Sequence, residues 1–131
     1  MKKSEHQEQV AYFDWVRLKA NSDFRYELIF AIPNGAKYGS DIKLRMIQAK
    51  KMKAEGLISG VPDIFIAYPV SLPDEGYIFP GAFIEMKVGK NKTSDNQKLM
   101  IENLRNVGYQ VAISYNAEEA REFTQSYFST K

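Results

Sequence analysis

The order of apolar and polar positions divides the first third of the chain into helix, strand and helix. The segment from Ser4 to Ala20 has no glycine or proline, and its apolar residues follow helical spacing. "FRYELIFAIP" (24–33) is rich in β-branched and aromatic residues before the turn at "PNG", so we predict a strand there. Ser40 or Asp41 can cap a second helix with apolar residues on one side and basic residues on the others, ended by "EGLISGVP".

Two apolar strands are predicted in the middle of the chain. They cover Asp63 to Tyr68 and Ala82 to Val88. The segment between them, "PVSLPDEGYIFPG" (69–81), contains three prolines and two glycines, which indicates a long hairpin loop. We therefore expect the two strands to be antiparallel neighbours.

The last third of the chain is predicted to be helix, strand and helix. Ser94 and Gln97 form a capping-box pair at the start of a helix that ends near Gly108. "YQVAISY" (109–115) follows as a strand, and Asn116 opens the final helix. The order α-β-α-β-β-α-β-α predicts an α/β fold in which helices flank a four-stranded mixed sheet. With 131 residues and no internal repeat, residues 1–131 are expected to form one domain.

Composition and charge narrow the possible functions only a little. There are 18 basic and 16 acidic residues, so the net charge of +2 does not by itself indicate a nucleic-acid partner. Six basic residues and one acid lie between Lys37 and Lys53, which suits either phosphate binding or a solvated helix face. The chain has no cysteine, no signal-peptide pattern and no apolar run long enough to cross a bilayer. These features predict an intracellular protein that does not insert into a membrane.

The candidate chemistry lies in the two middle strands. Side chains alternate along a strand, so Glu85 and Lys87 share one face while the residues between and beside them point into the core. Asp63 starts the neighbouring strand, and all three charges can meet at one end of the sheet. One interpretation is a solvated ion pair beside a turn residue. The other is a Mg²⁺ site in which the backbone carbonyl of Met86 joins Asp63 and Glu85, with Lys87 stabilising charge on a phosphate.

The sequence around these residues resembles a known nuclease family. "VPD" (61–63) and "IEMK" (84–87) match the PD-(D/E)xK signature, and "IPNGA", "KAEGLISGVPDIFIA", "FIEMK" and "TSDNQ…L…GYQVAI" resemble the VRR-NUC branch of that superfamily in order and spacing. The resemblance implies a restriction-endonuclease-like fold and a DNA endonuclease that depends on Mg²⁺ or Mn²⁺. It also implies a homodimer similar to Holliday-junction resolvases, encoded by a bacteriophage and working in the cytoplasm of a bacterial host.

Two further site residues follow from the resemblance, because the family also uses a glutamate of the first helix and a glutamine. Glu8 is the favoured acid, holding a metal through water, because it begins an inward-facing row of the helix; Glu5 remains the alternative. Gln97 is expected to reach the Glu85–Lys87 strand, although its capping role alone would explain it. His6, the single histidine, is interpreted as a surface residue that can contact DNA.

Basic and turn residues supply the expected DNA contacts. The resemblance places the "PNG" loop beside the substrate, and the basic cluster can bind phosphates without reading sequence. The residues are Asn34, Lys37, Lys43, Arg45, Lys50, Lys53, Lys90 and Lys92. No base-reading motif is visible, so recognition of DNA structure, such as a four-way junction, is favoured over recognition of sequence. A catalytically silent DNA-binding module with the same fold is the alternative function.

Overall fold

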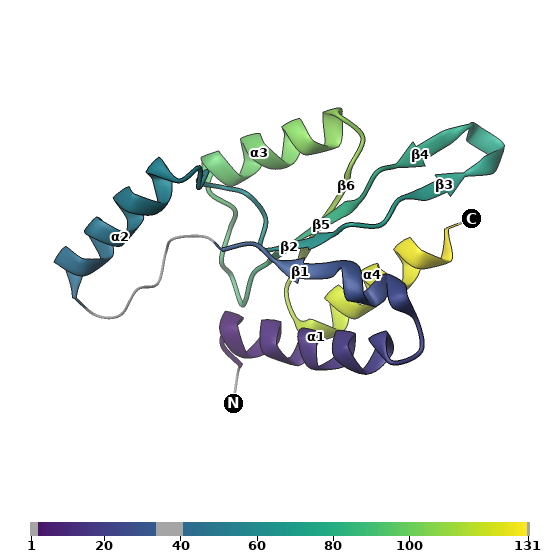
Figure 1. Ribbon diagram of the computed structural model, residues 1–131, viewed down its shortest axis with the longest axis horizontal. Helices are drawn as coiled ribbons and strands as arrows, with labels where there is room; N and C mark the ends of the chain where they lie inside the picture. The colour runs from purple at the N-terminus through teal and green to yellow at the C-terminus, as the bar shows by residue number, and fades with distance from the viewer. Residues whose placement is uncertain (1–2, 34–40, 131) are drawn as a thin grey trace.

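The computed structural model describes residues 3–33 and 41–130 (Figure 1). Asn34, Lys37 and Ser40 lie outside the described residues. The elements, in chain order, are α1 (Glu5–Ala20), η1 (Phe24–Leu28), β1 (Ile29–Ala31), α2 (Ile42–Ala54), β2 (Ile64–Ile66), β3 (Val70–Leu72), η2 (Pro73–Glu75), β4 (Tyr77–Phe79), β5 (Ala82–Met86), α3 (Asp95–Asn106), β6 (Gln110–Ser114) and α4 (Ala117–Ser129).

The main sheet has four strands in the order β1-β2-β5-β6. The β1–β2 and β2–β5 pairs are antiparallel, and β5–β6 is parallel because α3 carries the chain back across the sheet. The predicted mixed sheet and the antiparallel pairing of the two middle strands are therefore confirmed. Every residue of β5 is buried, so the strand that carries Glu85 lies in the interior of the protein.

Helices cover both faces of this sheet. In Figure 1, α1 and α4 lie together on one side, and α3 lies on the other. Tyr12 of α1 and Thr124 of α4 are both fully buried, and their hydroxyl oxygens are 2.8 Å apart in a hydrogen bond between the helices. The core on the α3 side is smaller and centres on Phe83, Ile101 and Val111. These two cores hold the sheet rigidly between its helices.

Capping residues fix where the site-bearing helices begin. Ser4 accepts a hydrogen bond from the Gln7 amide while the Gln7 side chain accepts one from the Ser4 amide. Ser94 and Gln97 make the same reciprocal pair at the start of α3, as the sequence predicted. Asp41, one of the two predicted caps, starts α2 by accepting hydrogen bonds from two backbone amides. The helix starts are thus determined locally.

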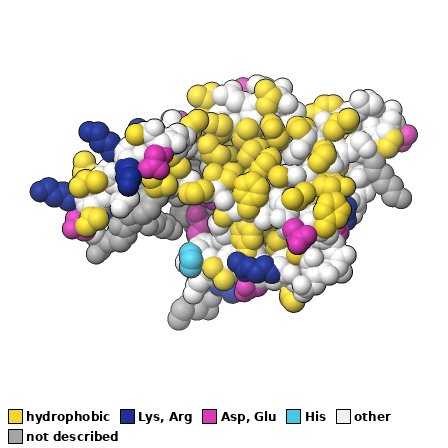
Figure 2. Space-filling view, viewed as in Figure 1, with side chains coloured by type: hydrophobic (Ala, Val, Ile, Leu, Met, Phe, Trp, Pro, Cys, Tyr) yellow, Lys and Arg dark blue, Asp and Glu magenta, His cyan; other side chains and the backbone are white. Residues whose placement is uncertain are grey.

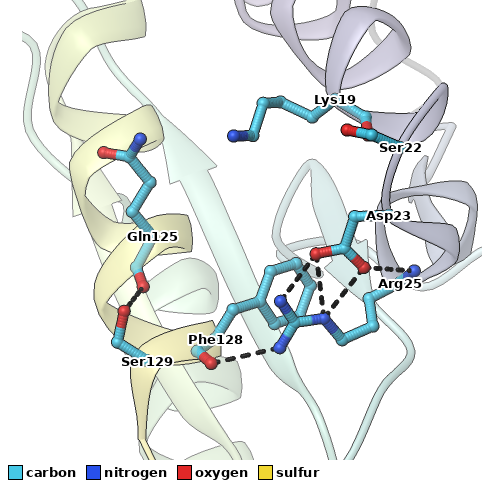
Figure 3. Close-up of polar contacts among 7 residues, drawn as sticks. All are labelled: Lys19, Ser22, Asp23, Arg25, Gln125, Phe128 and Ser129. Carbon is cyan, nitrogen blue, oxygen red and sulfur yellow. Dashed lines mark hydrogen bonds and ion pairs between the residues drawn. The ribbon is translucent and has the colours of Figure 1, made fainter.

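The predicted strand at 24–33 is wrong over its first half, where the chain forms the 3₁₀ helix η1. Asp23 caps this turn by accepting a hydrogen bond from the Arg25 amide, which competes with strand pairing. The Arg25 guanidinium also donates to both carboxylate oxygens of Asp23 and to the carbonyl oxygen of Phe128, as Figure 3 shows. This Asp23–Arg25 clamp ties η1 to the end of α4.

The predicted hairpin loop at 69–81 contains a small sheet of its own. Strands β3 and β4 pair across η2, and Gly76 takes the left-handed conformation that ends the turn. The Tyr77 hydroxyl donates to the carbonyl oxygen of Gly108, which attaches this hairpin to the end of α3. The alternation in "VSL" and the β-branched and aromatic residues of "YIF", on either side of "PDEG", are the signal for these strands, and the high content of proline concealed it.

The second helix does not bury its apolar side, contrary to prediction. Helix α2 has no buried residue and stands away from the sheet (Figure 1). Ile42 and Met46, which belong to the apolar side of this helix, are 65% and 67% exposed. Within the described residues, packing therefore contributes little to the stability of α2.

Candidate active site

The strand register brings the two predicted carboxylates together. Ile64 of β2 pairs with Ile84 of β5 in an antiparallel ladder, which places Asp63 directly opposite Glu85. The Cβ atoms of such a pair are about 5 Å apart. Asp63 Oδ2 accepts a hydrogen bond of 2.9 Å from the backbone amide of Met86, which fixes the orientation of that carboxylate. Both acids are buried, at 5% and 2% exposure.

Glu85 is held through only one of its two carboxylate oxygens. Its Oε2 accepts a hydrogen bond from Gln97 Nε2 at 3.1 Å and lies 3.8 Å from Lys87 Nζ. Its Oε1 is buried and receives no hydrogen bond within the part of the chain that the structure describes. A buried carboxylate oxygen in that position is costly unless a cation or a proton compensates it.

Gln97 lies between the acid and the base. Its Oε1 accepts hydrogen bonds from Lys87 Nζ at 2.9 Å and from the Ser94 amide at 2.8 Å. Because the amide oxygen faces two donors and the nitrogen faces Glu85, the orientation of the side chain is fixed. The same amide group therefore completes the cap of α3 and contacts both Lys87 and Glu85, where the sequence analysis expected it.

The pKa of Glu85 reflects this environment. Burial raises it most, and the neighbouring carboxyl of Asp63 raises it further, to about 8; Lys87 opposes the shift, and Glu5 adds a smaller increase. Two acids this close cannot both be charged without cost. Either a proton on Glu85 or a bound cation would reduce the repulsion between the two carboxylates.

A cavity of about 580 Å³ opens onto these residues. It is lined by Asp63, Glu85 and Gln97 from the sheet and α3, and by Glu5 and His6 from α1. In Figure 2 the histidine, coloured cyan, lies on the surface beside recessed acidic side chains. His6 is thus a residue of the cavity rim, which the position of a lone histidine in the sequence did not indicate.

The structure places Glu5, rather than the favoured Glu8, at this cavity. Glu8 Oε1 accepts a hydrogen bond from the amide of Ala117 at the start of α4 and does not line the cavity. Glu8 does begin an inward row with Tyr12 and Val16, but that row packs against α4. The inward face of α1 was correctly recognised, and the neighbour that it faces was not.

The donor set suits a hard divalent cation. Within residues 3–33 and 41–130, no three His, Cys, Asp or Glu side chains come close enough to hold a metal on their own. Two carboxylates with a backbone carbonyl and water are a typical donor set for Mg²⁺, which retains much of its hydration. Asp63, Glu85 and the carbonyl of Met86 fit this description, and Glu5 lines the same cavity.

The predicted DNA contacts fall in two described regions. Lys43, Arg45, Lys50 and Lys53 lie on α2, and Lys90 and Lys92 lie in the segment between β5 and α3. All of these side chains are exposed except that of Arg45, which is half-buried. Asn34 and Lys37 lie outside the described residues. None of the six described residues lines the cavity that contains Asp63 and Glu85.

Three features define the restriction-endonuclease-like class of proteins, PD-(D/E)xK. They are a four-stranded mixed sheet with helices on both faces, two acids opposite each other on adjacent strands, and a lysine two residues after the second acid. Within that class, the VRR-NUC domain family matches residues 4–117, and the chain belongs to this family of nuclease-type domains.

A solved structure of a protein named "VRR_NUC domain protein" has the same fold. It superposes on this chain with a TM-score of 0.75 at 21% sequence identity. The match covers 99% of this chain and 92% of the other, so the whole described architecture is shared. No curated protein sequence matches the chain.

Proposed function

We propose that this protein is a divalent-metal-dependent endonuclease that hydrolyses phosphodiester bonds in DNA. The observation that carries the proposal is the buried pair Asp63 and Glu85, in which one oxygen of Glu85 receives no hydrogen bond within the described chain and the pKa of Glu85 is raised. A structural ion pair has no need of such an arrangement, whereas a site prepared for Mg²⁺ or Mn²⁺ does.

The residues of the site would divide the chemistry among themselves. Asp63, Glu85 and the Met86 carbonyl would hold the cation, which supplies polarisation of a phosphate oxygen and acidification of water when bound. Lys87 uses one hydrogen bond to Gln97, and its other N–H groups can orient a water molecule or stabilise the charge that develops on the phosphate. Gln97 holds the ammonium in place.

We propose DNA as the substrate and recognition of its structure rather than its sequence. Helix α2 stands apart from the sheet (Figure 1), and its exposed lysines Lys43, Lys50 and Lys53 can contact the backbone of a strand entering the site. Such contacts depend on the spacing and charge of the phosphates and not on the identity of the bases. A branched substrate such as a four-way junction is the form we favour, because it offers several backbones at once.

A homodimer belongs to the same proposal. Ile42, Leu44, Met46 and Ile47 of α2 are all more than half exposed, an apolar surface that a second copy of the chain can cover. Light scattering after size-exclusion chromatography would test this, with a mass of about twice the 15.0 kDa of one chain as the expected result. A mass of one chain at micromolar concentration would contradict it.

None of the described helices could cross a bilayer.

A cleavage panel tests the proposed activity. The wild-type protein would be incubated with junction, flap, duplex and single-stranded DNA in Mg²⁺, Mn²⁺ or EDTA. We expect cleavage that EDTA abolishes and that Asp63→Asn reduces by about 10²-fold or more, because the amide still accepts the Met86 hydrogen bond but loses its charge. Salt-sensitive DNA binding without cleavage in any metal would instead support the silent module, and full activity in EDTA would exclude metal dependence.

A further inference from the structure

We infer that Gly60 is a positioning residue of the candidate site. The absence of a side chain at this position allows the loop that leads to Asp63 to contact the first turn of α3, which carries Gln97. This contact sets the separation between the metal-binding carboxylate and the amide that holds Lys87. The expected effect on catalysis rests on the proposed nuclease function, whereas the geometric effect does not.

The contact is closer than any side chain would permit. A Cβ atom at position 60 would lie 2.7 Å from the carbonyl oxygen of Asn96, 2.8 Å from its carbonyl carbon and 3.1 Å from the amide nitrogen of Gln97. All three atoms belong to the backbone, which cannot rotate away as a flexible side chain could. The φ angle of Gly60 is +93°, which also favours glycine. Any L-residue here must therefore move the loop or the helix.

The loop passes such a displacement directly to the carboxylate. Only two residues separate Gly60 from Asp63, and one of them is Pro62, whose ring fixes its own φ and whose side chain is fully buried. Beside the contact, the Asn96 side-chain amide donates a 3.5 Å hydrogen bond to Ser59. The two segments are thus joined at two adjacent points.

The helix side is equally intolerant of displacement. The Gln97 side chain makes three hydrogen bonds, to Lys87, Glu85 and the Ser94 amide, each between 2.8 and 3.1 Å. A shift of several tenths of an ångström in the first turn of α3 changes all three together. Lys87 and Glu85 lie 3.8 Å apart with the amide beside them, so moving Gln97 alters how the base and the acid face each other.

The chain supplies a matched control in Gly56. Its φ angle of +106° is close to that of Gly60, so alanine incurs a similar backbone penalty at either position. A Cβ at Gly56 would have no atom within 4 Å. Gly60→Ala and Gly56→Ala therefore share the cost of the left-handed conformation and differ in the contact with α3.

The first measurement follows the side-chain amide of Gln97 by NMR in the metal-free, full-length protein. We expect Gly60→Ala to shift the two Gln97 side-chain resonances and to speed their exchange with water, because the bonds to Glu85 and Lys87 lengthen. Gly56→Ala should leave both resonances in place and should lower the melting temperature less than Gly60→Ala does, because it has only the backbone cost that the two variants share. This readout needs no cleavage, so it stands even if the wild-type protein cuts no DNA.

The second measurement uses the proposed activity. With Mn²⁺ as the probe, Gly60→Ala should raise the metal concentration for half-maximal cleavage by about tenfold, since residues that orient metal ligands typically contribute that much. The KM for DNA should stay close to that of wild type, because Gly60 touches the site and not the basic helix. Gly56→Ala should match wild type in both quantities.

Equal behaviour of the two alanine variants in the NMR measurement would overturn the inference. If Gly60→Ala does not fold, Gly60→Asn and Gly56→Asn give the same comparison, since asparagine tolerates positive φ and still carries a Cβ atom. Unperturbed Gln97 resonances in a folded Gly60→Asn protein would likewise contradict the positioning role. Cleavage that is absent in wild type would reject the proposed function and leave the NMR comparison decisive for Gly60.

Discussion

Two acid–base pairs, each with its members two residues apart in sequence, have opposite characters in this protein. In the Asp23–Arg25 clamp the closest atoms are 2.6 Å apart, the Arg25 and Asp23 side chains are 30% and 26% exposed, and the pKa of Asp23 is lowered mainly by the hydrogen bonds from Arg25 (Figure 3). In the site the Glu85–Lys87 distance is 3.8 Å at 2% and 11% exposure, and the pKa of Glu85 is raised.

The difference separates a pair that stabilises the fold from one that is prepared for chemistry. Arg25 satisfies both oxygens of Asp23 and uses a remaining N–H on the Phe128 carbonyl. Glu85 is buried more deeply, where an incompletely paired carboxylate costs more. Even so, its partner Lys87 also donates a hydrogen bond to Gln97, and the carboxylate of Asp63 lies opposite it. Burial without full pairing is the pattern expected where a ligand completes the set.

Replacing the cation of the site should have the largest effect. Lys87→Met keeps the aliphatic stem and removes the charge, and we expect cleavage to fall by about 10²–10³-fold because a donor to the developing phosphate charge is lost. Circular dichroism should show an unchanged fold. Cleavage within a factor of about three of wild type would show that Lys87 does not take part in catalysis. Its role would then be structural, like that of Arg25 in the Asp23–Arg25 clamp.

The second-largest effect is expected from pH, which should act in opposite directions on the contributions of Glu85 and Asp23 to stability. The pKa of Glu85 is about 8 in the folded, metal-free protein and 4.5 in the unfolded chain, so between these values the folded state holds the extra proton. The free energy of unfolding in EDTA should therefore fall as pH rises from about 4.5 to 8. Mg²⁺ should stabilise the protein more at the upper end of this range than at the lower end.

The matched variant for this experiment is Glu85→Gln, which should remove most of that pH dependence in urea titrations. Asp23 has the opposite sign, because its folded pKa lies below 3.8; its contribution is present above that value and is lost as pH falls through its folded pKa. An unchanged slope between about pH 5 and 8 in Glu85→Gln would show that Glu85 is not the titrating group.

Removing the cation of the clamp should affect stability and leave activity intact. Arg25→Met loses the bonds to Asp23 and to the carbonyl of Phe128, together with the stacking of the guanidinium 4.5 Å from the Phe128 ring. We expect a loss of about 1–2 kcal/mol in the free energy of unfolding. Denaturant titration measures this, and a tenfold loss of cleavage would show instead that the clamp is coupled to the site.

An exposed pair supplies the smallest expected effect. Asp14 and Arg17 lie 3.2 Å apart on α1, with side chains 69% and 71% exposed. Asp14→Ala should change the free energy of unfolding by less than about 0.5 kcal/mol, because solvent already screens the pair. A loss as large as that of Arg25→Met would mean that exposure does not separate these pairs, and the comparison between them would fail.

Short-range rules in the sequence were sufficient for the central part of the site. The alternation in "FIEMK" and the antiparallel pairing of neighbouring strands predicted that Asp63 and Glu85 would meet. The capping box at Ser94 predicted where α3 begins, whereas the approach of Gln97 to Glu85 was expected from the family resemblance. Each of these rules concerns a strand, a pair of adjacent strands or a single helix turn. They hold because few other arrangements satisfy the backbone.

Rules of this kind could not say which neighbour a helix face meets. Glu5 and Glu8 both fit the N-terminal turn of α1, and only the docking of α4 beside Tyr12 assigns Glu8 to Ala117. Helix α2 was predicted correctly as a helix, whereas its expected burial against the sheet was wrong. Periodicity within one segment indicates which face of a helix is apolar, but not which distant segment packs against that face, because this depends on the whole fold.

The hydrogen bond from the Met86 amide to Asp63 constrains how this protein can diverge in evolution. Strand β2 begins at Ile64, so a carboxylate takes the place of a neighbouring strand as the acceptor for that buried amide. Loss of Asp63 would leave a buried N–H group unpaired, at a cost of about 1–3 kcal/mol. A lineage that abandoned catalysis would still be under selection to keep an oxygen at position 63, so Asn or Asp there is weak evidence of activity.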